Sequence, residues 1–339
     1  MGEITTVGID LAKNVFQVHG VDANGHIVVR KAVRRAQVVR FFEALPRCLV
    51  GMEACATAHY WARAIAALGH EVRLMPPQYV KAYVKRNKND AADAEAICEA
   101  VLRPSMRFVP VKSAEQQAVL MMHRARELLI RQRTMLVNAL RAHLAEFGIV
   151  AAQGIHRVDD LVAIVADEAD TRVPAIARLV LRVVADQIAV VQSGIEGINA
   201  RIVLWHRSSE VSQRLAGIPG VGPIVASAVA ASVPDASVFR CGREFAAWLG
   251  LVPRQSGTGG KTWLGRISRR GDGYVRRLLV TGALTALTRC KAVKALPWIE
   301  GMKARRKPPM VIAVALANKM ARMTWAMMVR GTAYRAPAA

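Results

Sequence analysis

Aromatic residues are scarce in this chain, where Phe, Trp and Tyr make up 5% of 339 residues. Stacking of many rings on nucleic acid bases is therefore a secondary mode of recognition at most. Acidic residues are also few, because 25 Asp and Glu stand against 48 Lys and Arg and leave a formal net charge of +23. Such an excess argues against a typical enzyme of small neutral molecules and indicates an extended polyanion as partner. Nucleic acid is the first candidate, and an anionic membrane is the alternative.

Cysteine is rare, and long uninterrupted apolar runs are missing. The cysteines are odd in number, widely spaced and free of any Cys-x-x-Cys pair, which argues against a zinc site or a disulfide framework. They are Cys48, Cys55, Cys98, Cys241 and Cys290. No signal peptide is visible, and Lys319 and Arg322 interrupt the most apolar late stretch, 310–329, so we expect an amphipathic helix there. These absences predict a cytoplasmic protein without a membrane partner.

The first part of the chain alternates between strand and helix patterns. Five strands are predicted, at residues 7–10, 15–19, 27–30, 48–53 and 71–75. The first three form an antiparallel meander, and helical segments are expected at 37–45 and 61–68. Strands that alternate with helices after a meander predict an α/β layer with a mixed sheet. We assign this domain to residues 1–111.

Residues 112–208 lack strand patterns and predict two long helices. Ser113 and Gln116 form a capping box for a helix that runs to Phe147 and closes at Gly148. A second helix is expected to begin near Pro174, and at about 1.5 Å per residue each helix is roughly 45 to 50 Å long. Its expected apolar side consists of Ile176, Val180, Val183, Val190, Ile198, Ile202 and Trp205. An antiparallel coiled coil or dimerisation arm and a simple extra helical bundle fit this pattern equally well.

The last region, residues 209–339, is strongly basic and mainly helical. It holds 21 Lys and Arg against 5 Asp and Glu, so +16 of the total charge lies here, and this region is expected to make most of the contacts to the polyanion. Residues 215–223 place Gly220 and Gly222 in a tight turn before Pro223, which fits the first position of a helix. This pattern predicts a helix-hairpin-helix that binds phosphates through backbone N–H groups. A glycine-rich packed turn is the alternative.

Four carboxylates are positioned to form a metal site. Asp10 and Glu53 each end a predicted strand, and Asp90 and Asp93 lie three residues apart in an Asn-Asp-Ala-Ala-Asp run. If a helix begins at that run, both of its acids lie on one face of the first turn. Taken alone, the pair is also explained by an N-cap at Asp90 and a helix-dipole contact at Asp93. All four together predict an oxygen-only cage for Mg²⁺ that suits phosphoryl transfer.

A glycine-rich stretch at residues 253–261 carries two hydroxyls, those of Ser256 and Thr258, and a basic turn follows at 265–272. We expect a flexible loop that binds phosphates, with hydroxyls that cap and bind more readily than they attack. The residues expected to contact nucleic acid are Gly220, Gly222, Arg254, Lys261, Arg266, Arg269, Arg270 and Arg276.

Six motifs in this order resemble those of the DEDD transposases of the insertion-sequence one-ten group, recombinases guided by a structured bridge RNA. The motifs are VGIDLAK (7–13), MEA (52–54), NDAADA (89–94), GIPGVG (217–222), LGLVPR (249–254) and GRISRRGD (265–272). Each motif is weak alone, but their order and spacing over nearly the whole chain are specific.

The resemblance implies an RNase-H-like, RuvC-like domain in which Asp10, Glu53, Asp90 and Asp93 bind one or two Mg²⁺ ions, with no organic cofactor. It also implies a serine nucleophile that joins covalently to DNA. Members carry Ser or Thr just before the glycine pair, which aligns with Thr258, whereas we favour Ser256 because a primary hydroxyl attacks with less crowding.

The resulting prediction is a DNA recombinase that works as a homo-oligomer, a dimer or tetramer, with DNA and a bridge RNA as partners. It divides the chain into a catalytic domain (1–111), a helical assembly region (112–208) and a C-terminal transposase domain (209–339). Two alternatives stay open at this point. One is a Holliday-junction nuclease that uses the four acids with water, and the other is a nucleic-acid-binding protein without catalysis.

Overall fold

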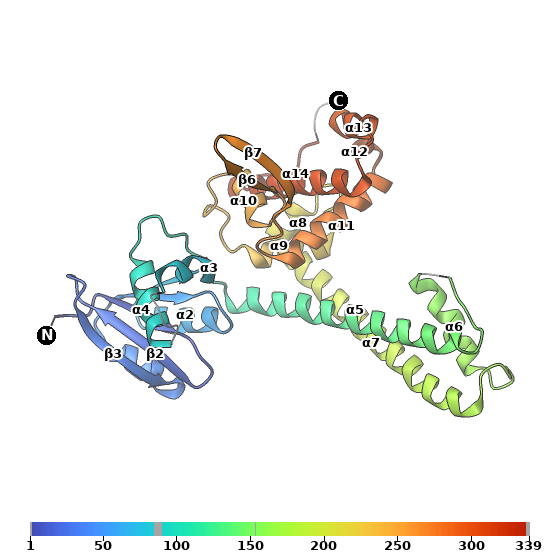
Figure 1. Cartoon of the computed structure of the whole chain (residues 1–339), viewed down its shortest axis with the longest axis horizontal. Helices are drawn as coiled ribbons and strands as arrows, with labels where there is room; N and C mark the ends of the chain where they lie inside the picture. Colours follow the sequence, from blue (N-terminus) through green and yellow to red (C-terminus); the bar gives the residue numbers. More distant parts are fainter. Residues whose placement is uncertain (1, 85–89, 153, 337–339) are drawn as a thin grey trace. The chain divides into compact units, whose positions relative to one another are not determined.

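The computed structural model describes residues 2–84, 90–152 and 154–336 (Figure 1). Asn89, the first residue of the acidic run, lies outside these ranges. The chain divides into two compact units. The first consists of residues 1–117 and 231–240, and the second consists of residues 118–230 and 241–339.

The first unit contains a mixed five-stranded sheet. Its strands are β1 (Thr6–Asp10), β2 (Val15–Val21), β3 (Ile27–Arg34), β4 (Leu49–Glu53) and β5 (Glu71–Met75). Their order is β3-β2-β1-β4-β5, with β1, β2 and β3 antiparallel and β1, β4 and β5 parallel. The predicted meander and mixed sheet are confirmed, and the arrangement is consistent with a RuvC-like fold.

The helices of the first unit are α1 (Val38–Glu43), α2 (Ala58–Ala66), α3 (Pro77–Val80) and α4 (Asp90–Val101). Two short 3₁₀ turns, η1 (Arg35–Gln37) and η2 (Lys81–Tyr83), adjoin α1 and α3. Ile9, Phe16, Met52 and Ile65 are fully buried between sheet and helices. Burial of such side chains, at roughly 1.5 to 3 kcal/mol each, fixes the strands that end at the predicted acids.

Two long helices dominate the middle of the chain, α5 (Ala114–Ala145) and α7 (Ala175–Ser208). The predicted capping box is present, because Gln116 N donates to Ser113 Oγ at 3.0 Å and Ser113 N donates to Gln116 Oε1 at 2.9 Å. Gly148 follows the end of α5 with φ +74°, the left-handed conformation of a closing glycine. The connection holds a 3₁₀ turn, η3 (Ile155–Arg157), and a short helix, α6 (Val158–Ala166), which the sequence patterns did not indicate.

The helices α5 and α7 pair in antiparallel fashion. Arg126 Nε donates to Asn199 Oδ1 at 2.6 Å, and Arg133 Nη1 donates to Gln192 Oε1 at 2.6 Å, so residue numbers rise on one helix as they fall on the other. Towards α6, Leu140, Leu144 and other apolar residues form a buried cluster.

The predicted apolar side of α7 differs from the side that is buried. The helix buries Leu181, Ala185, Ile188, Ile195 and Ile202. Of the residues predicted to line one apolar side, only Ile202 is buried, and Ile176, Val180, Val183 and Val190 are 60 to 79% exposed. The helix therefore carries two apolar faces, and the sequence pattern did not distinguish the one that α5 and α6 cover.

The C-terminal part is mainly helical. Its helices are α8 (Glu210–Leu215), α9 (Pro223–Ser232), α10 (Gly242–Trp248), α11 (Gly273–Arg289), α12 (Lys291–Lys294), α13 (Pro297–Ala304) and α14 (Pro309–Arg330). Helix α14 packs against α10 and α11. Among the described residues, no helix combines the length and the apolar character needed to cross a membrane.

The stretch expected as a flexible loop is instead a two-stranded β ribbon, β6 (Pro253–Thr258) and β7 (Lys261–Ile267). Gly259 and Gly260 form its turn with φ +53° and +76°, the positive values that a two-residue hairpin turn requires. The glycines therefore close a regular hairpin instead of loosening the chain.

Candidate metal and nucleic-acid site

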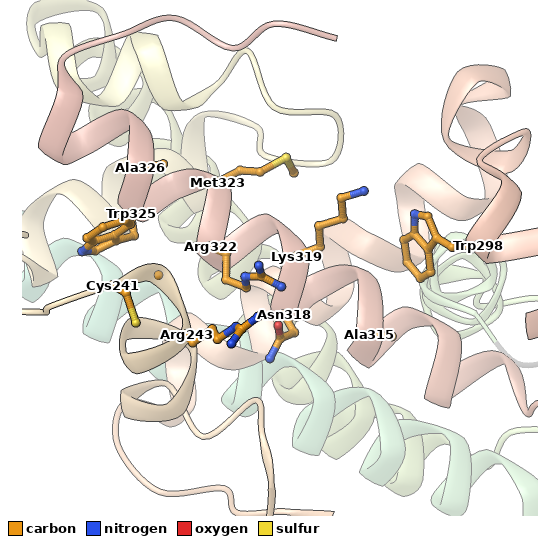
Figure 2. A pocket seen from close by; sticks show the side chains of 11 residues that line it. Cys241, Arg243, Trp298, Ala315, Asn318, Lys319, Arg322, Met323, Trp325 and Ala326 are labelled. Atoms are coloured by element: carbon orange, nitrogen blue, oxygen red, sulfur yellow. The ribbon is translucent and has the colours of Figure 1, made fainter. Parts of the chain in front are cut away.

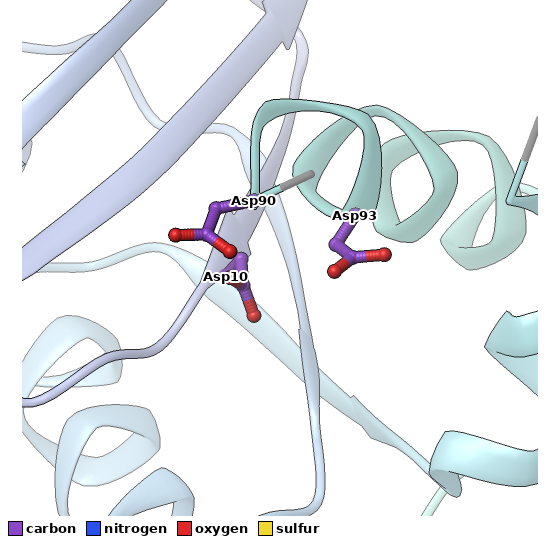
Figure 3. A group of neighbouring side chains, drawn as sticks. All are labelled: Asp10, Asp90 and Asp93. Atoms are coloured by element: carbon purple, nitrogen blue, oxygen red, sulfur yellow. The ribbon is translucent and has the colours of Figure 1, made fainter. Parts of the chain in front are cut away.

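Three of the four predicted carboxylates converge. Asp10 ends β1, and Asp90 and Asp93 lie on the first turn of α4 (Figure 3). One carboxylate oxygen from each of these three lies within 4.8 Å of the others. Asp10 and Asp93 are half-buried, and Asp90 is exposed. This spacing lets a single cation contact all three side chains.

Glu53 lies beside this cluster. Ile9 pairs with Met52 in the parallel ladder of β1 and β4, so Asp10 and Glu53 are the next residues of two neighbouring strands. Partial burial raises the pKa of Asp10 to about 6, and the negative charges of Asp93, Asp90 and Glu53 contribute to the rise. A cation bound among these oxygens would relieve that repulsion.

Two glycines in the sheet allow α4 to approach. A Cβ on Gly8 would lie 2.3 Å from the carbonyl oxygen of Ala94 and 2.4 Å from the backbone nitrogen of Cys98. A Cβ on Gly51 would lie 2.8 Å from Cβ of Val101. Because glycine has no side chain, α4 packs directly on β1 and β4 and carries its two acids to the end of β1.

The two candidate hydroxyls share one face of the ribbon. Ser256 pairs with Trp263 and Thr258 pairs with Lys261, whereas Gly257 pairs with Thr262. Since alternate residues of a strand point to opposite faces, Ser256 and Thr258 point the same way. Both are exposed, and neither hydroxyl forms a hydrogen bond with a described residue.

The predicted basic turn at 265–272 begins inside β7, and the part that follows the strand is held by hydrogen bonds from the Arg276 side chain to backbone carbonyls. Arg276 Nη1 donates to the carbonyls of Arg270 at 2.8 Å and Leu249 at 3.0 Å. The sequence predicted that this side chain contacts phosphate, and in the structure it forms hydrogen bonds within the protein. A Cβ on Gly250 would lie 2.4 Å from the Arg270 carbonyl, which explains a glycine there. The other predicted basic residues, Arg254, Lys261, Arg266, Arg269 and Arg270, are all exposed.

The two glycines of the turn between α8 and α9 lie in different surroundings. Gly220, with φ +88°, packs so closely on α11 that its Cβ would lie 2.4 Å from the Gly282 carbonyl. Gly222 is exposed, and nothing lies within 4 Å of its Cβ position. Close packing therefore explains a glycine at position 220, and no such packing requires one at position 222.

A buried polar relay joins α5, α9 and α11, and no sequence pattern indicated it. His123 lies 3.0 Å from the Tyr274 hydroxyl through Nδ1 and 3.1 Å from Ser227 Oγ through Nε2. Ser227 donates to the Pro223 carbonyl at 2.6 Å, so Nε2 donates to Ser227 and Nδ1 accepts from Tyr274. Burial, with Arg126 and Arg124 nearby, lowers the pKa of His123 to about 4. The relay fixes Tyr274 at the start of α11, directly after the basic turn.

Comparison with known proteins decides the family. A transposase family model of the DEDD type matches residues 7–149, and a model described as the transposase IS116/IS110/IS902 family matches residues 212–296. A probable family 20 transposase of Pseudomonas aeruginosa is 53% identical, covering 98% of this chain and 99% of that protein. The chain belongs to the IS110 family of DEDD transposases.

Two further relatives agree along nearly the whole length of this transposase. The transposase of insertion sequence element IS1328 from Yersinia enterocolitica is 41% identical, covering 98% of this chain and 99% of that protein. The transposase of IS1111A from Coxiella burnetii is 39% identical, covering 99% of this chain and 92% of that protein. The chain is thus a DNA-cleaving and recombining enzyme with DNA as a partner, and its DEDD domain implies a divalent metal cofactor.

Proposed function

We propose that this transposase cleaves and exchanges DNA strands through a covalent protein–DNA intermediate, with Ser256 as the nucleophile and Asp10, Glu53, Asp90 and Asp93 as ligands of Mg²⁺. The observation that carries the proposal is the convergence of three carboxylates within 4.8 Å. An insertion-sequence transposase supplies the setting in which such a site acts on DNA phosphates.

The donor set fits Mg²⁺. All candidate ligands are carboxylate oxygens, and Mg²⁺ prefers oxygen ligands with water in its remaining positions. Partial exposure of the cluster leaves room for water and for a phosphate oxygen. Bound there, the ion would stabilise charge on the phosphate and favour ionisation of the attacking hydroxyl.

The covalent step balances without a further reactant. The oxygen of Ser256 forms a bond to phosphorus as its proton passes to solvent, and the bond from phosphorus to one deoxyribose oxygen breaks. That oxygen takes up a proton and leaves as a free hydroxyl. Attack of a second strand's hydroxyl on the serine phosphodiester then reverses the step and completes exchange.

Basic groups of the second unit would hold the substrate. The exposed guanidinium groups of Arg254, Arg266, Arg269 and Arg270 and the ammonium group of Lys261 bind phosphates and offset charge in the transition state. Gly222, exposed in the glycine turn between α8 and α9, would add a backbone contact to phosphate. We assign target choice to a bridge RNA, since the few aromatic residues favour backbone contacts.

Exposed apolar residues on α7 support a proposal of self-association. Ile176, Leu179, Val180 and Val183 recur at helical spacing on this helix and are 60 to 79% exposed. An exposed apolar stripe of this kind is typical of a surface that pairs with another chain. We propose that it joins copies of the transposase into a dimer or tetramer through helical arms that form coiled coils.

The deciding experiment detects the covalent intermediate. Stalled reactions of the full-length protein with Mg²⁺ should give, on a denaturing gel, a labelled DNA strand that migrates with protein and that protease releases. Ser256→Ala should abolish this species, and Thr258→Ala should reduce it partially. Asp10→Asn should lower cleavage by about a thousand-fold, as expected for loss of several kcal/mol of metal catalysis, and leave DNA binding within a few-fold.

Thr262→Ala is the matched control, because this exposed hydroxyl lies on the opposite face of the same ribbon. It should leave adduct formation unchanged. Loss of the adduct in Thr258→Ala together with full activity in Ser256→Ala would move the nucleophile to Thr258. Cleavage at the wild-type rate in both variants, with no adduct, would contradict the covalent mechanism and favour attack by water.

A further inference from the structure

A groove in the C-terminal part carries cations and indole rings that play no part in the proposed cleavage chemistry. It lies between α10, α13 and α14 and has a volume of about 840 Å³. Residues Arg243, Trp298, Asn318, Lys319, Arg322 and Trp325 line it (Figure 2).

The groove is lined by three cations, and no acidic residue is among the described residues that line it. Arg243 comes from α10, and Lys319 and Arg322 come from α14, and none of the three forms an ion pair within the described part of the chain. In the view of Figure 2 they gather between Trp325 and Trp298. Cations brought together without acidic partners repel one another, and an anion in the groove removes that repulsion.

Two indole rings also line the groove. Lys319 Nζ lies 5.4 Å from the ring centroid of Trp298, within the range of a cation–π contact. Trp298 and Trp325 are both partly exposed. An indole face next to an ammonium group is the combination that binds a nucleobase together with its phosphate.

The groove is held by close packing. A Cβ on Gly242 would lie 3.1 Å from Cα of Arg322, so this glycine lets the start of α10 approach α14. Asn318 Nδ2 donates to the Leu251 carbonyl at 3.2 Å, which fixes the amide next to the cations. Asn318, Arg322 and Trp325 recur at intervals of four and three residues and therefore line one face of α14.

We propose that this groove binds an unpaired nucleotide of a single-stranded nucleic acid, with its base stacked on Trp298 and its phosphate between Arg243 and Arg322. A duplex keeps its bases stacked inside and cannot present one to an indole, whereas a single strand can turn a base outward. The volume suits a ligand of one or two nucleotides, since sites for small molecules span roughly 300 to 1,000 Å³. This inference does not depend on the cleavage mechanism.

The test uses the full-length protein without divalent metal and fluorescently labelled oligonucleotides of mixed sequence, both DNA and RNA. Arg243→Gln with Arg322→Gln should weaken binding of single strands at least ten-fold more than it weakens binding of a duplex. The control pair is Lys303→Gln with Arg330→Gln, two exposed cations of α13 and α14 that do not line the groove. The control should weaken both ligands equally and by less.

Stacking is tested separately. Trp298→Ala should lower single-strand affinity by about 5- to 160-fold, which corresponds to the roughly 1 to 3 kcal/mol found for base stacking, and Trp298→Phe should restore most of it. An oligonucleotide that is abasic throughout should bind wild type and Trp298→Ala equally. Equal loss for normal and abasic strands would overturn the stacking assignment.

Cys241 gives a direct readout of occupancy. This exposed thiol lines the groove, whereas Cys290 follows α11 and does not line it. A bound single strand should slow alkylation of Cys241, followed by mass spectrometry, and leave Cys290 unchanged. Protection of neither thiol, or of both equally, would contradict the proposal. Comparison of the DNA and RNA arms then identifies which strand is the ligand.

Discussion

The carboxylates of the first unit and the hydroxyls of the ribbon are the two groups that the proposed chemistry needs. They differ in what holds them in place. Asp10 and Glu53 end strands whose preceding residues, Ile9 and Met52, are fully buried. Ser256 and Thr258 lie on a ribbon in which only Ile267 is even partly buried. The acids are thus positioned by a hydrophobic core, and the hydroxyls are positioned by hydrogen bonds between two strands.

This difference separates a preformed site from one completed on binding. A core held by buried side chains keeps its acids in place without substrate. A two-stranded hairpin is marginally stable by itself in water. We therefore expect contacts of the ribbon with nucleic acid or with another protein surface to fix the proposed nucleophile.

The largest effect on stability is expected from filling the space beside β1. Gly8→Ala places a methyl group against the backbone of Ala94 and Cys98, so α4 must shift and carry Asp90 and Asp93 away from Asp10. Overpacking costs about 1 to 3 kcal/mol, and a displacement near 1 Å costs about a hundred-fold in rate. Thermal unfolding and strand cleavage measure the two effects.

Gly265→Ala is the matched control in the ribbon, because the nearest atom to its Cβ position lies 3.8 Å away. It should change the melting temperature little. A Gly8→Ala variant with wild-type melting temperature and cleavage would show that α4 adapts freely. That result would contradict the view that the core holds the acids in place before substrate binds.

The sequence predicted the acid cluster because local rules determine it. Apolar runs specified the strands β1 and β4, and a parallel pair brings their carboxyl ends together. The meander and the capping box at Ser113 were also read correctly, since turn and cap residues act on their immediate neighbours.

The ribbon was predicted wrongly because glycine is common both in flexible loops and in tight hairpin turns. Gly259 and Gly260 were taken as a source of flexibility, whereas positive φ values make them a hairpin turn. The buried face of α7 was missed because both of its faces are apolar, and only packing decides between them. The relay of His123, Ser227 and Tyr274 joins residues more than a hundred positions apart in two of its bonds, which no local pattern reveals.

The second prediction concerns acid stability and tests whether the buried contacts of Tyr274, at the start of α11, are as fixed as the acids. The folded pKa of His123 is lowered to about 4 from 6.5, so the unfolded state binds more protons between these values, and stability falls as the pH falls through this window. This group alone should remove about 2 kcal/mol between pH 7 and pH 5. Denaturant unfolding at several pH values measures the slope.

His123→Gln should flatten that slope, although it lowers stability at pH 7 by weakening the bonds to Tyr274 and Ser227. His59 in the first unit provides the counterpart, since burial, Lys112 and Arg63 lower its pKa to about 4 as well. It is less buried, so solvent screening reduces its contribution, and His59→Gln should flatten the slope less. An unchanged slope in His123→Gln would show that the relay is open to water.

The smallest effect on stability is expected at the proposed nucleophile itself. Ser256 and Thr258 are exposed and form no side-chain hydrogen bond with a described residue, so truncation removes no packing. Ser256→Ala should leave the melting temperature unchanged within about 1 °C, and Thr258→Ala should lower it slightly, because a β-branched residue favours a strand by up to about 1 kcal/mol. Calorimetry of the DNA-free protein measures both. If Ser256→Ala unfolds several degrees lower, the hydroxyl stabilises the fold. Loss of the adduct in this variant would then not show that the hydroxyl is the nucleophile. If stability is unchanged and the adduct is lost, the oxygen of Ser256 serves the reaction alone, as expected for a nucleophile that its substrate brings into place.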